Sequence, residues 1–373
     1  MKAKGFCIAF LAALLALPVS FAVARNYIDT TNYENREYAP FPELSLKTFG
    51  VFPYGFERYL NDHLPYKNQL TRLNAQLEDA AGLNNTMLQY FNTDSVIHGK
   101  DGWLFYNASG YESTINDYLC NNLYDEAELQ RLAAGYQALN DKYRDQGITF
   151  VLMIPTNKEQ VYPEYMPDAL QPTGTESRTD QLVTYLKEHT TVPVVYTKEA
   201  LLGAKQDAQV FYKYDSHWNQ PGAFVGEQLL REVLQGEKDA LSEYEIKELP
   251  DRFVGDLATV SGMQDTLYEY PAEVIGYKPD VTATLTSEED SAEATMMSYV
   301  SDAPDQRKLL MIKDSYFYSM LPFLSKDFGE TLFTTDSTLA KELIAERHPD
   351  IVVLEIVERH FYRAEHQWEE LLQ

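Results

Sequence analysis

The hydrophobic and polar positions of this chain switch repeatedly between two periods from about residue 126 onward. Short continuous runs of apolar, often β-branched residues predict buried strands, and longer segments with apolar residues three and four apart predict helices. The predicted strands cover residues 149–154, 192–196, 308–312, 330–334 and 350–356, and the predicted helices cover residues 126–146, 179–188, 220–234, 316–328 and 338–347. Strands and helices that alternate at this spacing are typical of an α/β fold with a mostly parallel sheet flanked by helices.

Two segments outside this alternation have their own patterns. Residues 96–106 form two short β-type runs around Gly99-Lys100-Asp101-Gly102, which predicts a hairpin whose turn uses glycine at positive φ. Residues 255–299 are polar and acidic near their end, with no clear periodicity. We interpret them as a long irregular insertion that borders the functional site.

The start of the chain has a pattern typical of export. Lys2 and Lys4 precede an uncharged apolar run over residues 6–24, which ends in the small residues Ala22-Val23-Ala24. This order of features is that of a signal peptide. Because the run is also about as long as a bilayer-spanning helix requires, an uncleaved membrane anchor is the alternative. With either outcome we expect the body of the chain to be exported, to the periplasm, the cell surface or the extracellular space.

These patterns divide the chain into three parts. Residues 1–24 are predicted to be a signal peptide or an N-terminal membrane anchor, and residues 25–95 a linker followed by a helical segment. Residues 96–373 are predicted to form one α/β domain, with the insertion at about residues 255–300.

Composition narrows the class of partner. The chain has 31 Lys and Arg against 57 Asp and Glu, which gives a formal net charge of −26. A protein this acidic repels nucleic acid phosphates and anionic lipid headgroups. We therefore expect no nucleic acid partner, and membrane contact only through the N-terminal segment.

The two cysteines also bear on the compartment. Cys7 lies inside the apolar segment, so Cys120 has no partner in the exported body of the chain. An exported protein without disulfides fits a bacterial cell envelope better than a eukaryotic secretory pathway.

Two short segments, about a hundred residues apart, contain the groups of a serine nucleophile, its base and an orienting carboxylate. Asp215 and His217 are two residues apart, so their side chains project to the same side of an extended backbone. Ser315 follows a predicted strand and precedes a predicted helix. In a parallel sheet that is where ligand crevices form, and the helix start offers N–H groups for an oxyanion. If the two segments meet in space, acyl transfer through Ser315 is the predicted chemistry.

Each segment also has a simpler interpretation. Asp215 could cap a turn, and Asp314 or Ser315 could be an ordinary helix N-cap. Arg359 follows another strand end, where it could hold a substrate oxygen or form a surface ion pair. We expect no metal site, because no histidine near His360 and His366 has ligand spacing, and no cofactor, because the chain has no phosphate-binding or dinucleotide glycine motif.

Several segments together resemble the DHHW family and the SGNH-hydrolase-like alginate O-acetyltransferases of the AlgJ and AlgX type. The resemblance covers most of the chain from about residue 35, and its segments follow in the family's order. They are Asn35-Arg36-Glu37, Phe41-Pro42-Glu43-Leu44, Tyr59-Leu60-Asn61-Asp62, residues 96–106, Ile154-Pro155 through Lys158-Glu159 to Tyr162-Pro163-Glu164, Tyr214 to Ala223, Ser315-Tyr316, and residues 349–353 with Glu358-Arg359.

The resemblance implies a fold, a site and a reaction. The implied fold is an SGNH-hydrolase-like, flavodoxin-like α/β core over residues 96–373. Ser315 would be the nucleophile, His217 the base and Asp215 its orienting carboxylate. The implied reaction is O-acetylation of an exported polysaccharide, with the acetyl group supplied by a membrane-bound O-acyltransferase partner. We further expect Tyr316, Arg359 and Trp218 to contact substrate, and backbone N–H groups near Ser315 and Tyr316 to bind the oxyanion.

The chain departs from the family pattern at two positions. Ser216 stands where the family has a second histidine, and Lys313 replaces the usual glycine two residues before the serine, which affects the expected oxyanion hole. Two further functions stay open at this point. One is an esterase that removes acetyl groups from surface glycans with the same triad, and the other is a non-catalytic assembly protein of a polysaccharide-export complex.

Overall fold

The computed structural model describes residue 16 and residues 19–28, 30–32, 38–42, 52–70, 72–73, 96–107, 114–290 and 295–373, without the side chains of residues 290 and 362–366. Most of the predicted leader, and most of the predicted helical segment up to residue 95, lie outside these residues. Helix α2 (Phe52–Asp62) lies in that segment, and residues 67–70 and 72–73 are helical as well. Among the residues described, no helix has both the length and the apolar character to cross a bilayer.

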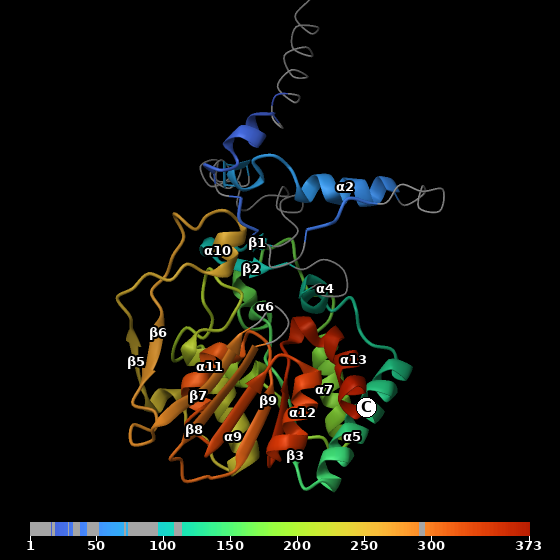
Figure 1. Cartoon of the computed structure of the whole chain (residues 1–373), viewed down its shortest axis with the longest axis vertical. Helices are drawn as coiled ribbons and strands as arrows, with labels where there is room; N and C mark the ends of the chain where they lie inside the picture. Colours follow the sequence, from blue (N-terminus) through green and yellow to red (C-terminus); the bar gives the residue numbers. More distant parts are fainter. Residues whose placement is uncertain are drawn as a thin grey trace, which may run out of the picture.

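A seven-stranded sheet forms the centre of the molecule, in the order β4-β3-β11-β9-β10-β8-β7 (Figure 1). The neighbours β4 (Val194–Tyr196), β3 (Thr149–Ile154), β11 (Ile351–Glu355), β9 (Lys308–Ile312) and β10 (Glu330–Thr334) are parallel. The antiparallel strands β8 (Thr295–Ser301) and β7 (Ala283–Asp290) extend one side. The carboxyl ends of the parallel strands share one edge, so the loops that follow them meet there.

Helices cover both faces of the sheet (Figure 1), which explains the continuous apolar runs. In β9, Leu309 and Met311 belong to one core, whereas Leu310 and Ile312 belong to the other, because side chains alternate along a strand. Helices α9 (Gln220–Gln235) and α11 (Phe317–Leu324) contribute to the first core. The second core takes its helical side chains from α5 (Glu126–Asp145), α7 (Arg178–His189), α12 (Ser337–Arg347) and α13 (Phe361–Leu372).

The helix ends follow the capping residues of the sequence. Asp125 and Glu128 form a capping box at the start of α5. The side chain of Asn219 accepts a hydrogen bond from the N–H of Gly222 at the start of α9, and Gly236 ends that helix at φ 79°. The α/β fold, the mostly parallel sheet and the hairpin of β1 (Val96–His98) and β2 (Leu104–Tyr106) are therefore confirmed.

The expectation of an irregular insertion is wrong. Residues 256–301 contain α10 (Asp256–Val260), β6 (Ala272–Ile275) and the sheet strands β7 and β8, and β6 pairs with β5 (Glu245–Glu248). Strand β7 was not predicted because Ala283–Asp290 is polar. An edge strand with one side facing solvent is often polar. Short helices also form at α4 (Thr114–Leu119), α6 (Lys158–Val161) and α8 (Lys198–Ala204).

A buried carboxyl pair lies between α9 and the end of α11. Glu227 has no exposed surface and Asp327 has 2%. Tyr277 and Lys278 both donate to Oδ1 of Asp327, at 2.8 and 2.5 Å. Burial, and then the neighbouring Asp327, raise the pKa of Glu227 well above its ordinary value. Glu227 therefore stays protonated at a pH where an exposed glutamate is ionised.

This pair predicts a loss of stability at higher pH. Because the pKa of Glu227 is higher in the folded than in the unfolded state, its contribution is complete below about pH 4.5 and is lost as the pH rises through the folded-state pKa. Glu227→Gln removes the ionisable group and should flatten this decline with pH. The measurement is the free energy of unfolding by urea between pH 5 and 9. Glu232→Gln, at an exposed position of the same helix, is the control, and equal slopes for all three proteins would refute the assignment.

Candidate active site

The two segments singled out in the sequence meet at the carboxyl edge of the sheet. Ser315 lies in the turn between β9 and α11, and Asp215 and His217 lie in the loop that leads into α9. This loop, residues 213–217, contains two of the predicted catalytic residues and is for that reason called the catalytic loop below. The side chain of Ser315 is exposed, that of His217 is 24% exposed, and Asp215 is buried. A large molecule in solution can therefore reach the serine and the imidazole.

The three side chains form one continuous chain of hydrogen bonds. Nε2 of His217 lies 2.7 Å from Oγ of Ser315, and Nδ1 lies 2.7 Å from Oδ1 of Asp215. The same Oδ1 also accepts the backbone N–H of His217 at 2.8 Å. With Nδ1 protonated and donating to Asp215, Nε2 is free to accept the proton of Ser315. This is the arrangement in which an imidazole acts as a general base towards a serine.

The Asp215 carboxylate stays ionised despite its burial. Burial by itself would raise the pKa of Asp215, but the hydrogen bond and charge of His217 and the N–H of Asp256 outweigh it and lower the pKa to about 2. Oδ2 of Asp215 accepts that N–H at 2.7 Å. The negative charge opposite the imidazole is thus present throughout the neutral range.

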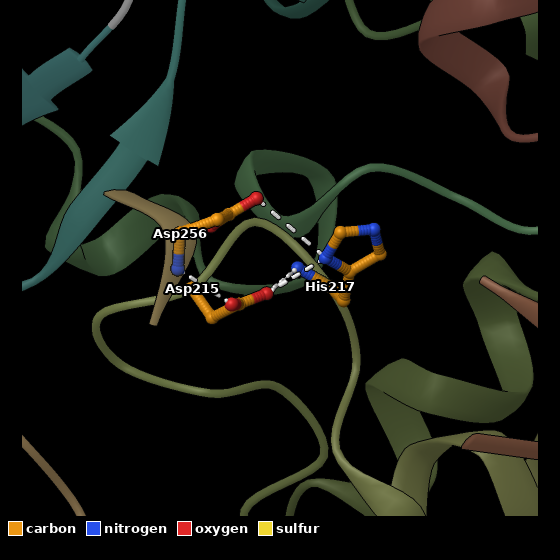
Figure 2. A group of neighbouring side chains, drawn as sticks. All are labelled: Asp215, His217 and Asp256. Carbon is orange, nitrogen blue, oxygen red and sulfur yellow. Dashed lines mark hydrogen bonds and ion pairs between the residues drawn. The ribbon is translucent and has the colours of Figure 1, made fainter. Parts of the chain in front are cut away.

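A second carboxylate, Asp256, approaches the same ring nitrogen. Figure 2 shows Asp215 and Asp256 on one side of the imidazole, with the second ring nitrogen pointing away from both. Oδ2 of Asp256 lies 3.6 Å from Nδ1 of His217 and accepts the hydroxyl of Ser216 at 2.5 Å, while Oδ1 accepts the N–H of Ser216 at 2.7 Å. Burial and the nearby Asp215 raise the pKa of Asp256. Its position lets it add to the negative field on an imidazolium.

The group of Asp215, His217 and Asp256 is close enough to hold a metal ion. Its atoms are already engaged, however, because both oxygens of each carboxylate accept hydrogen bonds within the protein. We therefore interpret the group as a hydrogen-bonded pair of carboxylates around one imidazole.

Two reciprocal hydrogen bonds tie the catalytic loop to the serine turn. Nε1 of Trp218 donates to the carbonyl of Tyr316 at 2.8 Å, and the hydroxyl of Tyr316 donates to the carbonyl of Ser216 at 2.8 Å. Neither the Trp218 nor the Tyr316 side chain has any exposed surface. Each residue is the direct neighbour of a triad residue, so the two bonds fix the position of His217 relative to Ser315.

The burial of these side chains conflicts with their predicted role in binding substrate. Arg359, the third residue given that role, is 6% exposed and donates to both oxygens of Ser216 and to the hydroxyl of Tyr316, each at 3.3 Å. In this arrangement Trp218, Tyr316 and Arg359 support the catalytic loop from behind. We therefore propose that they position the triad.

The catalytic loop has little regular backbone pairing, and charged side chains take over that task. The ammonium of Lys158 is buried and donates to the carbonyls of Leu104, Lys213 and Asp215 at 2.6, 2.9 and 3.0 Å. Burial lowers the pKa of Lys158 to about 7, against the opposing pull of Glu269 and other carboxylates. Glu269 accepts the N–H groups of Lys213 and Tyr214 at 3.0 and 2.9 Å. The loop is thus held by a cation on its carbonyls and an anion on its N–H groups.

Gly255 allows the insertion to approach this loop. A Cβ at Gly255 would lie 2.2 Å from the carbonyl oxygen of Tyr214 and 2.7 Å from the nitrogen of Asp215. Only a residue without a side chain permits this contact between backbones. The close approach places Asp256 beside His217.

The serine turn is held by a second set of carboxylates. Glu355 accepts the N–H of Asp314 at 2.7 Å, and Asp314 accepts the N–H groups of Tyr316 and Val357 at 2.8 and 2.7 Å. The N–H of Tyr316 is therefore engaged and does not have the free position expected for an oxyanion donor. For the N–H of Ser315, no acceptor is found among the described residues. Lys313 has no positive φ, so the turn forms without the family's glycine.

Sequence reasoning identified the triad candidates and missed their supports. Asp256 and Glu269 belong to the predicted insertion, and Lys158 belongs to a segment of the family pattern for which the sequence indicates no role. One signal was available for Lys158, because it lies directly after a buried strand end in a segment of the family pattern. Nothing in the spacing of Asp256 or Glu269 indicates contact with the catalytic loop.

The amino-acid sequence of this chain matches a known protein family and a known protein. A family described as the SGNH hydrolase-like domain of the acetyltransferase AlgX matches residues 96–356. A probable alginate O-acetylase AlgJ of Pseudomonas syringae is 28% identical over 223 residues, 56% of this chain. This match spans half the length of that relative.

Two solved structures were also compared with this chain. A DHHW family protein from Eubacterium siraeum has a TM-score of 0.53 at 16% identity, over 74% of this chain and 95% of that protein. The O-acetyltransferase domain of Pseudomonas putida AlgJ has a TM-score of 0.45 at 19% identity, over 71% of this chain and 91% of that domain. The family match covers well over half of the chain, including both segments of the triad. The chain therefore belongs to the AlgX family of SGNH hydrolase-like acetyltransferase domains.

Proposed function

We propose that this chain is an exported O-acetyltransferase that moves an acetyl group through Ser315 onto a hydroxyl of a cell-surface or extracellular polysaccharide. The observation that carries the proposal is the unbroken hydrogen-bond chain from Asp215 through His217 to Ser315, with 2.7 Å at each step. It occurs in a chain of an acetyltransferase family and ends in an exposed serine.

The first half-reaction forms an acetyl-serine. Nε2 of His217 takes the proton of Ser315, and Oγ attacks the acetyl carbonyl of an ester donor. The tetrahedral intermediate then expels the donor's alkoxide, which leaves as an alcohol with the proton from His217. Asp215, aided by Asp256, stabilises the imidazolium that exists between these steps.

The second half-reaction returns the enzyme to its first state. A sugar hydroxyl enters where the donor alcohol left and gives its proton to Nε2 of His217. Its oxygen attacks the acetyl carbonyl, the bond to Ser315 breaks, and Oγ recovers its proton from His217. The free N–H of Ser315 is the oxyanion donor we propose for both steps.

We also propose that the donor is supplied by a membrane-bound O-acyltransferase, as the family resemblance implies. The apolar N-terminal segment would deliver the chain across the membrane or hold it there. A purified chain would then need an artificial ester as donor.

An esterase is the second candidate, and the exposure of Ser315 favours it. Water can reach an acyl group on an exposed serine, and it would then take the place of the sugar hydroxyl. The two functions differ in the direction of one change. Incubated with an acetyl donor, an unmodified oligosaccharide gains acetyl groups from a transferase, and an acetylated oligosaccharide without donor loses them to an esterase. Mass spectrometry of the glycan decides between them, with Ser315→Ala as the blank.

The triad predicts an ordered series of losses. Ser315→Ala and His217→Ala should each lower kcat/KM for an activated acetyl ester by at least about 10³-fold, because nucleophile and base act as a unit. Asp215→Asn should cost less, since Asp256 lies 3.6 Å from the same nitrogen. Adding Asp256→Asn to Asp215→Asn should then cost more than the sum of the two single losses, measured as a double-mutant cycle. Strictly additive losses would show that Asp256 does not compensate for the loss of Asp215.

Substitution of Lys158 is predicted to lower the reaction rate, although Lys158 is not proposed to contact the substrate. Lys158→Met removes three hydrogen bonds from backbone carbonyls around the catalytic loop, and a small displacement of His217 can cost about 100-fold in rate. We expect kcat to fall by about 10- to 100-fold, with a much smaller change in KM for the ester. Lys205→Met is the matched control, because Lys205 also donates to the carbonyl of a buried residue, Val161 at the end of α6, and not to the catalytic loop. Equal kcat values for wild type and both variants would contradict the positioning role.

A further inference from the structure

The ring of Tyr318 is the exposed aromatic surface beside the nucleophile. Tyr318 is 48% exposed, whereas Phe317 and Met320 on the same helix have no exposed surface. It lies three residues after Ser315, and Tyr316 between them already has helical φ and ψ of −65° and −29°. Residues three apart on a helical turn are neighbours on one face. The exposed ring therefore lies within about one helical turn of the exposed serine.

The ring is held in place from behind. The ammonium of Lys313 lies 3.8 Å from the centroid of the Tyr318 ring, and Lys313 is only 5% exposed. A second ring, that of Phe317, lies 5.3 Å from the same ammonium. This contact orders the tyrosine before any ligand arrives, which lowers the entropy cost of binding. It also gives a local role to the lysine that replaces the family's glycine.

The charges around the serine are those of an acidic site. Asp215, Asp256 and Asp314 lie beside the triad, and the whole chain has a formal net charge of −26. Three cations lie near the site, and all three are buried. Lys158 and Arg359 donate to oxygen atoms of the protein behind the catalytic loop, and the ammonium of Lys313 lies against the rings of Tyr318 and Phe317. A polymer with one carboxylate per sugar would meet repulsion here, whereas an uncharged chain would not.

We propose that the acceptor is an uncharged glycan whose sugar ring stacks on Tyr318, next to the acetyl-serine. The inference rests on the proposed transferase function and adds the substrate class to it. Stacking of a flat ligand face on an aromatic ring requires no charge and is compatible with an acidic surrounding. The acceptor hydroxyl is then brought to Ser315 from one helical turn away.

The test separates acceptor binding from chemistry. With an activated acetyl ester as donor, Tyr318→Ala should raise KM for uncharged β-linked gluco- or xylo-oligosaccharides by about tenfold, with a much smaller effect on the rate at which Ser315 is acetylated. Tyr318→Phe keeps the ring and should restore KM. Tyr185→Ala, on α7 at the opposite face of the sheet, is the control and should behave as wild type. An unchanged KM in Tyr318→Ala would overturn the proposal that the acceptor sugar stacks on Tyr318.

A comparison of uncharged and charged acceptors tests the proposal that the glycan is uncharged. Uncharged oligosaccharides should be acetylated at least tenfold more efficiently than oligomannuronates of the same length, and 0.5 M salt should narrow that difference by screening. A preference for the oligomannuronate would overturn the uncharged class.

A binding measurement keeps the inference independent of catalysis. In the Ser315→Ala background, calorimetry should detect the uncharged oligosaccharide and show about tenfold weaker binding once Tyr318→Ala is added. If the glycan binds with this dependence on Tyr318 but the wild type never acetylates it, the proposed function is wrong and the proposed sugar-binding role of Tyr318 is kept. If Tyr318→Ala has no effect on glycan binding, the sugar-binding role of Tyr318 is wrong, whatever the acetylation activity.

Discussion

The site depends on two buried hydrogen bonds that cross between segments about one hundred residues apart. Trp218 donates to the carbonyl of Tyr316, and Tyr316 donates back to the carbonyl of Ser216. Both side chains are fully buried, so either bond, if broken, would leave a polar group without water to replace its partner. Each partner is the sequence neighbour of a triad residue. The packing of the core between α9 and α11 therefore fixes the 2.7 Å contact of His217 with Ser315.

Around this link the backbone is held by ionisable side chains where regular pairing is missing. Lys158, Glu269 and Arg359 bind the catalytic loop, and Asp314 and Glu355 bind the serine turn. Burial lowers the pKa of Lys158 and raises the pKa values of Glu269 and Glu355, so these groups are poor sources of net stability. What they provide is a defined position for the proposed catalytic side chains on loops. This interpretation also explains why Trp218, Tyr316 and Arg359, which the sequence predicted to contact substrate, lie behind the site.

The strands could be predicted because a sheet covered on both faces requires continuous apolar runs, as β9 and β3 have. Spacing alone left the meeting of Asp215, His217 and Ser315 conditional, and the family resemblance implied it; what each does in a reaction is our proposal. Polar β7 could not be recognised, since its stability comes from its pairing with β8. Asp256 could not be found either, because its approach to His217 depends on the backbone contact at Gly255.

The central claim is that Ser315 carries the acetyl group. The most direct measurement is the intact mass of the full-length protein after a brief exposure to an activated acetyl ester, with Ser315→Ala treated in parallel. The account predicts one added acetyl group on the wild type, located on Ser315 by peptide mapping and absent from the variant. A wild type that gains no acetyl group and shows no Ser315-dependent ester hydrolysis would contradict it.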